Sequence, residues 1–169
     1  MHYLSLTRRT LLLGTLCIPA IAQANTLERQ VYTEQGQRTT LREYAKEGNL
    51  LLSVWSYYCS PCIAEIPGVN NFTKRIAVLG LCLMPEQDYV PESAAIKDFR
   101  KQRGELDLAF PNVLLYDREK DELLKEAPFT FIPAFILLKN TGEIAYWQQG
   151  SILNRQKRIK LEQAIRRLS

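Results

Sequence analysis

Two cysteines with only two residues between them closely follow a continuous apolar run, and this arrangement narrows the folds open to the chain. The run covers residues 50–55 and contains one serine, which is typical of a buried strand. Cys59-Ser60-Pro61-Cys62 comes next, with its proline where the first turn of a helix tolerates one. The sequence therefore predicts a buried strand and then a helix over about 61–74, with Cys59 at the N-terminus of that helix.

The spacing of these cysteines has a chemical consequence. Both sulfur atoms can meet across one helical turn, and the free N–H groups and dipole at a helix start favour a thiolate. Cys59 is then the exposed nucleophile, and Cys62, one turn further in, is the thiol that resolves a mixed disulfide. A static disulfide is one alternative, although so short a loop gives little entropic stabilisation. Half of a zinc site is another, and the second half is absent.

Residues 1–24 are predicted to be a signal peptide. Arg8 and Arg9 precede an apolar run over 11–22, and Ala22-Gln23-Ala24 forms a small-x-small cleavage site. The run is too short to span a membrane comfortably. Export by the Sec or the twin-arginine route is therefore expected, which would place the protein in the periplasm or another extracytoplasmic compartment of a bacterium.

Two alternatives remain for this N-terminal segment. It could stay uncleaved as an anchor, or Cys17 could carry a lipid, although Leu16 stands where a lipoprotein signal has a small residue. On the cleavage hypothesis the folded domain covers residues 25–169.

Removal of the signal peptide would also remove the only histidine, His2. Without histidine, a Ser-His-Asp or Cys-His nucleophile and any His-ligated metal site are excluded. The cysteines left would be Cys59, Cys62 and Cys82, one fewer than an all-cysteine zinc site needs. The chain has no Gly-rich phosphate loop and no basic and aromatic interleaving. We therefore expect no cofactor, no metal and no nucleic-acid partner.

The rest of the chain alternates between strand and helix patterns. Residues 25–38 are expected to be irregular or a hairpin with its turn at 34–37. Helices are expected over residues 41–46, 91–102, 119–126 and from Asn154 to Leu168. Strands are expected over residues 76–83, 113–116, 134–138 and 144–148. Alternating units of this kind predict an α/β fold with helices on both faces of a parallel sheet. The last two strands form a hairpin, so the central sheet is expected to be mixed.

Three motifs carry a family resemblance. Residues 51–62 resemble the active-site strand and turn of thioredoxins, and Cys62-Ile63-Ala64-Glu65-Ile66-Pro67 resembles the exported TlpA, ResA and DsbE-like branch. Residues 131–138 resemble the second thioredoxin hallmark, a cis-proline that leads into a strand, and residues 140–144 match the turn after it. The resemblance covers residues 38–168 and implies a thioredoxin-like fold.

The resemblance assigns roles to individual residues. It implies that Cys59 attacks, that Cys62 resolves, and that the two form a redox-active disulfide. Trp55 resembles the tryptophan beside that disulfide, or it is a plain core aromatic. Pro133 resembles the cis-proline that faces the cysteines, or it is an ordinary trans-proline. A cis bond there would leave the backbone of Ile132 free to pair with a substrate strand.

Glu65 resembles the acid that tunes the couple in the ResA-like branch. It lies three residues after Cys62, on the same helix face, where a partly buried carboxylate could hold or relay a proton. A solvated helix glutamate is the alternative.

Two departures from the family pattern stand next to the cysteines. Ser53 occupies the position, six residues before Cys59, where thioredoxins have a buried aspartate that accepts a proton. Tyr57 and Tyr58 replace a small residue and a tryptophan, so the client-facing surface at Tyr58 is altered.

These features together predict an exported thiol:disulfide oxidoreductase that acts on cysteine-containing client proteins, as a reductase. The resemblance implies a membrane thiol reductant of the DsbD or CcdA type as its electron donor. A disulfide-forming oxidant and a non-catalytic chaperone or assembly module of the same fold are the alternatives. Cys82 is expected to be a buried structural thiol, and the basic last helix is expected to be solvated, with contact to anionic lipid as the alternative.

Overall fold

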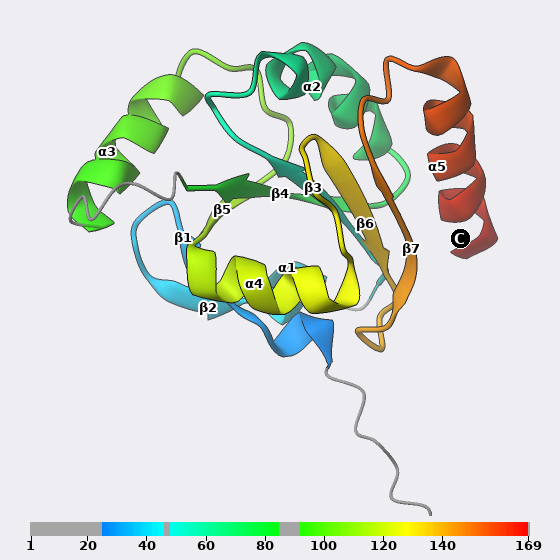
Figure 1. The fold of residues 1–169 in the computed structure, drawn as a ribbon, viewed down its shortest axis with the longest axis horizontal. Coiled ribbons are helices and arrows are strands. Elements are labelled where there is room, and N and C mark those ends of the chain that lie inside the picture. The colour runs from blue at the N-terminus through cyan, green and yellow to red at the C-terminus, as the bar shows by residue number, and fades with distance from the viewer. Residues whose placement is uncertain (1–24, 46–47, 85–91, 169) are drawn as a thin grey trace, which may run out of the picture.

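The computed structural model describes residues 25–45, 48–84 and 92–168, which form one seven-stranded sheet with the strand order β2-β1-β5-β4-β3-β6-β7 (Figure 1). The three central strands are parallel: β3 (Leu50–Trp55), β4 (Ala77–Leu83) and β5 (Asn112–Leu115). The other four pair antiparallel: β1 (Gln30–Thr33), β2 (Arg38–Thr40), β6 (Ala134–Leu138) and β7 (Ile144–Gln149). The signal peptide predicted at 1–24 lies outside the described residues.

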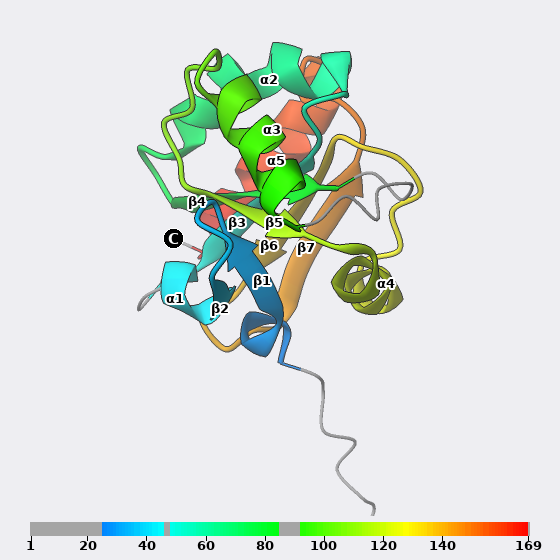
Figure 2. The same cartoon turned by 90° about the vertical axis from the view of Figure 1, so that its left-hand side faces the viewer.

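Helices cover both faces of the sheet (Figures 1 and 2). One face carries α2 (Ser60–Phe72), α3 (Glu92–Arg103) and α5 (Arg155–Leu168). The other carries the short helix η1 (Thr26–Glu28), α1 (Arg42–Ala45) and α4 (Asp117–Glu126). The predicted α/β class, with a mixed central sheet between two helix layers, is confirmed.

Strand β3 divides its side chains between the two cores. Leu50, Leu52 and Val54 pack into the core under α1 and α4. Leu51 and Trp55 pack on the opposite side with α2, α3 and α5, and the alternation of a strand places Ser53 on that side too. Because both faces of β3 are covered, all six of its residues are buried, which explains why its sequence is continuously apolar.

The N-terminal lead-in is a hairpin, the second of the two predicted alternatives. Strands β1 and β2 pair on either side of the turn at residues 34–37, where Gly36 has a φ of 78°. The hairpin also joins the main sheet, because Tyr32 and Thr33 pair antiparallel with Leu114 and Val113 of β5. The sequence did not predict this second pairing.

Candidate active site at the start of helix α2

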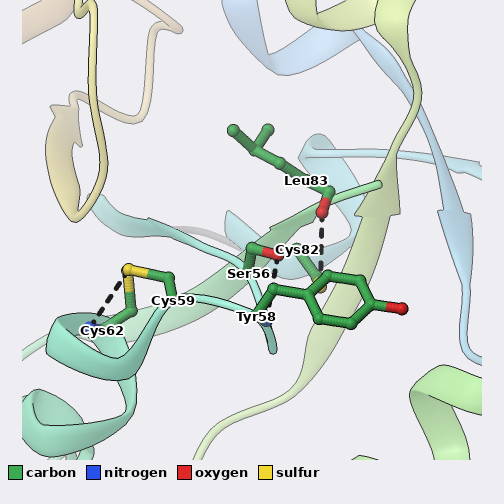
Figure 3. The surroundings of a disulfide bond; sticks show 6 residues. All are labelled: Ser56, Tyr58, Cys59, Cys62, Cys82 and Leu83. Carbon is green, nitrogen blue, oxygen red and sulfur yellow. Dashed lines mark hydrogen bonds between the residues drawn. A yellow bond between two sulfur atoms is a disulfide. The ribbon is translucent and has the colours of Figure 1, made fainter. Parts of the chain in front are cut away.

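Helix α2 begins at the cysteine pair. Cys59 is its N-cap residue, with extended backbone angles, and Pro61 lies in the first turn. The backbone N–H of Cys62 donates to the sulfur of Cys59 at 3.2 Å and to the carbonyl of Cys59 at 2.9 Å (Figure 3). The N–H of Ile63 donates to the same carbonyl at 3.1 Å. One N–H of the first helical turn, that of Cys62, therefore reaches the sulfur of Cys59, and the other bonds join the Cys59 carbonyl to the helix.

Cys59 and Cys62 are joined in a disulfide with their Cα atoms 5.2 Å apart. The two residues differ in exposure, because Cys59 is partly exposed whereas Cys62 is only 4% exposed. Cys59 is therefore the more accessible of the two residues to a thiol from outside. This asymmetry is the one expected of an attacking and a resolving cysteine.

The two tyrosines before Cys59 separate into a buried and an exposed one. Their rings pack against each other with centroids 4.1 Å apart. Tyr57 is buried, and burial raises the pKa of its hydroxyl. Tyr58 is 65% exposed, and its backbone N–H donates to the Ser56 hydroxyl (Figure 3). Tyr58 therefore presents an aromatic side chain to solvent beside the exposed cysteine.

The Ile132–Pro133 peptide bond is cis. The carbonyl of Pro133 accepts a 2.6 Å hydrogen bond from the N–H of Gly150, while the backbone N–H and carbonyl of Ile132 make no hydrogen bond to another described residue. The side chain of Ile132 packs against the cluster that holds Cys62 and Trp55, and Cys59 packs against the same cluster. The structure thus brings Ile132 and the cysteines together, with the backbone of Ile132 unpaired among the residues that the structure describes.

Trp55 lies inside the core beside this site. It is 3% exposed, and its ring packs near Phe99, with centroids 6.4 Å apart. The indole N–H donates to the side-chain oxygen of Asn112 at 3.0 Å. Because Trp55 is buried, any effect on a bound client would pass through the residues that cover it. Sequence reasoning missed Asn112, which is a single polar residue at the start of an apolar strand.

Glu65 is buried, so it is not the solvated helix glutamate that was the alternative in the sequence. It is 1% exposed. Neither carboxylate oxygen of Glu65 has a partner among the described residues at the distance and angle of a normal hydrogen bond. Burial raises the pKa of Glu65, and this rise is opposed by the Ser151 hydroxyl, by the N–H groups of Ile152 and Leu153, and by Lys157. A role in holding or relaying a proton stays a prediction.

No carboxylate replaces the missing aspartate on β3. Ser53 is buried and lies in register with Gly80 of β4 and Phe135 of β6. Ser53 and the two residues paired with it across the sheet therefore carry no charge.

Cys82 is a buried free thiol, as its apolar surroundings in the sequence indicate. Burial raises its pKa to about 12, against the opposing effect of the Tyr57 backbone. Its sulfur lies 3.9 Å from the Leu83 carbonyl oxygen (Figure 3). Cys82 is thus a neutral side chain of the core at ordinary pH.

The exposed large apolar side chains include Tyr58, Phe131 and Leu153. Each belongs to a connection at the same end of the sheet, because β6 runs antiparallel to β3 and β7 runs antiparallel to β6. These connections lead from β3 to α2, into β6, and from β7 to α5. We call the three side chains the apolar rim. Exposed large apolar side chains that are grouped on one part of a surface are typical of a protein-binding site.

Within residues 25–45, 48–84 and 92–168, no group of three or more His, Cys, Asp or Glu side chains could hold a metal ion. No helix among these residues has both the length and the apolar character needed to cross a membrane.

No family model and no curated protein matches this sequence. Solved structures match in fold. A secreted disulfide oxidoreductase of Mycobacterium tuberculosis, homologous to E. coli DsbE, aligns with a TM-score of 0.60 at 14% identity, over 86% of this chain and 100% of that one. The thioredoxin domain of a Bacteroides vulgatus thiol-disulfide oxidoreductase aligns with a TM-score of 0.57 at 18% identity, over 83% and 99% of the two chains.

A third similar structure is an exposed lipoprotein thioredoxin of Streptococcus pneumoniae, with a TM-score of 0.54 at 20% identity, over 76% of this chain and 97% of that one. The fold is thioredoxin-like. The fold that the sequence motifs predict is thereby confirmed. In this thioredoxin-like fold the cysteine pair, the cis-proline and the apolar rim all lie at one end of the sheet.

Proposed function

We propose that this protein is a thiol:disulfide oxidoreductase with Cys59 and Cys62 as its redox couple. The observation that carries the proposal is the disulfide at the start of α2, in which the sulfur of the partly exposed Cys59 receives the N–H of Cys62 and the buried Cys62 stands one turn further along the helix. A bond that closes only a four-residue loop adds little stability, which favours chemistry over a structural role.

In the reducing direction, the Cys59 thiolate attacks one sulfur of a client disulfide. The client S–S bond breaks, a Cys59–client disulfide forms, and the released client sulfur takes a proton. The Cys62 thiolate then attacks the sulfur of Cys59, so that the Cys59–Cys62 disulfide forms and the second client sulfur leaves and is protonated. The client gains two electrons and two protons in total, and the couple supplies the electrons.

We infer that the protein works as a reductase, which a dithiol donor must return to its reduced form. A membrane thiol reductant of the DsbD or CcdA type fits this requirement by its chemistry. The opposite direction, client oxidation, uses the same sulfur atoms. Equilibration of the couple with glutathione separates the directions, since a potential near that of strongly oxidising couples, about −120 mV, would contradict the reductase proposal.

The proposed clients are cysteine-containing proteins that present an extended segment. The unpaired backbone of Ile132 offers hydrogen bonds to such a segment, in the manner of strand addition. The apolar rim offers contacts for side chains beside the client cysteine.

We also propose that the protein is exported and works outside the cytoplasm. The sequence of residues 1–24 supports this proposal. The structures that it resembles include a secreted oxidoreductase and an exposed lipoprotein. Fusion of residues 1–24 to a reporter that is active only outside the cytoplasm tests it, with Arg8 and Arg9 both changed to Lys to separate the two export routes.

Trapping with Cys62→Ser tests the proposed function. This variant keeps the attacking sulfur and lacks the resolving one, so it should accumulate client proteins as mixed disulfides that dithiothreitol releases. Cys59→Ser should trap none, and Cys82→Ala should behave as wild type. Equal capture by Cys59→Ser and Cys62→Ser would favour the alternative of a non-catalytic chaperone.

A further inference from the structure

We propose that Asn112 is a positioning residue for the redox couple, because its amide fixes the Trp55 indole in the packed cluster that also holds Cys62. This inference rests on the proposed function.

The amide of Asn112 uses both of its polar ends. Asn112 stands at the start of β5 and is 3% exposed. Its side-chain oxygen accepts from the indole N–H of Trp55 at 3.0 Å, and its side-chain nitrogen donates to the Phe110 carbonyl at 3.1 Å. The amide orientation follows from these partners, since an indole can only donate and a carbonyl can only accept. The side chain is therefore held from both sides, and it in turn fixes the plane of the indole ring.

The strand between Asn112 and Trp55 is built to admit this contact. Gly80 of β4 lies in register with Asn112 on one side and with Ser53 on the other. A Cβ atom on Gly80 would stand 1.8 Å from the Asn112 side-chain oxygen and 2.9 Å from the Trp55 indole nitrogen. Only glycine leaves room for a hydrogen bond that crosses β4 at this point. The contact between Trp55 and Asn112 therefore depends on β3, β4 and β5 together.

The indole belongs to the surroundings of the couple. Trp55 shares a packed cluster with Cys62 and Phe99, and Cys59 packs against that cluster. Trp55 also ends β3, four residues before Cys59. Its partner is a neutral amide, so the contact fixes the ring without adding a charge that would act on a thiolate. Loss of the contact would leave the indole N–H buried without an acceptor, and the ring would shift to find one.

Asn112→Leu tests this role, because leucine has a similar volume and no acceptor. In a Trp147→Phe background Trp55 is the only tryptophan, so the change in its fluorescence on reduction of the disulfide reports how closely the ring lies to the sulfur atoms. We expect this change to shrink by about half, and the glutathione equilibrium constant of the couple to move by about threefold or more. Val113→Ala, on the same strand but in the opposite core, is the matched destabilised control and should leave both readouts unchanged.

Two outcomes would overturn the positioning role. One is an Asn112→Leu protein that is less stable but matches Val113→Ala in both redox readouts. The other is measured on the unaltered full chain, so it applies even if Asn112→Leu does not fold. The NMR signal of the Trp55 indole N–H should move between the oxidised and reduced states, while that of Trp147 stays in place. An unmoved Trp55 signal would contradict the inference. If wild type itself exchanges no disulfides, the proposed function fails instead.

Discussion

The backbone N–H of Cys62 points at the sulfur of Cys59 from 3.2 Å away. When the disulfide opens, the same N–H remains at the start of α2, beside the sulfur that becomes a thiolate. The start of a helix stabilises an anion at this position. A thiolate at Cys62, which is buried one turn further in, does not receive this stabilisation.

Cys59 should therefore be alkylated far faster than Cys62 in the reduced protein. With iodoacetamide at neutral pH, we expect about a tenfold or greater difference in rate between the two cysteines, measured by mass spectrometry of the digested protein. Equal rates, or a rate for Cys59 no higher than that of an unstructured peptide thiol, would contradict the assignment of the nucleophile.

Cys82 should remain unmodified under the same conditions. Burial excludes the reagent and raises the pKa of the thiol to about 12, so little thiolate forms at neutral pH. Labelling of Cys82 is expected only when urea unfolds the protein, and the urea midpoint for labelling should match that seen by circular dichroism. Rapid labelling of Cys82 in the native protein would show that the core around it opens.

Glu65→Gln should change how stability depends on pH. Burial raises the pKa of Glu65 above its usual 4.5, so the folded chain holds this proton at pH values where the unfolded chain has lost it. The free energy of unfolding contributed by Glu65 is therefore highest below pH 4.5 and falls as the pH rises through the folded pKa. The glutamine variant lacks this fall, so its stability relative to wild type should increase from acid to neutral pH.

Urea titrations at several pH values measure this difference. Glu105→Gln, at an exposed position, is the control and should follow wild type throughout. A difference between Glu65→Gln and wild type that does not vary with pH would show that the carboxyl group titrates alike in both states.

Polar substitution in the apolar rim should weaken exchange with proteins and spare exchange with small molecules. Tyr58→Ser and Phe131→Ser remove exposed apolar surface without touching the couple, so KM for reduction of a protein client such as insulin should rise. The rate with glutathione disulfide should stay within about twofold of wild type, because surface changes of this kind seldom disturb a folded core. Equal losses with both substrates would indicate damage to the couple instead of loss of a client contact.

Gly80→Ala should destabilise the fold. The added methyl group would overlap the Asn112 side chain, and overpacking of a core costs about 1–3 kcal/mol. Urea denaturation measures the loss, and Gly104→Ala, at an exposed position, is the control. An unchanged urea midpoint for Gly80→Ala would mean that the core around Asn112 is looser than the contacts indicate.

Much of this molecule follows from local sequence patterns. The apolar runs at β3, β4 and β6 are continuous because both faces of these strands are covered, and the helix that begins at Cys59 follows from the spacing of the cysteines and from Pro61. Asn154 caps α5 as the sequence predicts, since its side chain accepts from the N–H groups of Gln156 and Lys157.

Other features depend on contacts between distant segments. The sequence predicts that Glu65 shares a helix face with Cys62, but the burial of Glu65 depends on the connection over residues 150–154, which is remote in sequence. The pairing of β1 with β5 and the contact between Trp55 and Asn112 also join segments far apart in the chain. A short polar strand or a single asparagine carries no periodic signal that would reveal such a partner.

Insulin reduction by the wild type, Cys59→Ser, Cys62→Ser and Cys82→Ala proteins, with dithiothreitol as the donor, tests the central claim most directly. Wild type and Cys82→Ala should accelerate the reaction equally, and each single serine variant of the couple should fall to the rate of dithiothreitol alone. Acceleration that survives Cys59→Ser would contradict the claim that a sulfur at the start of α2 carries the chemistry.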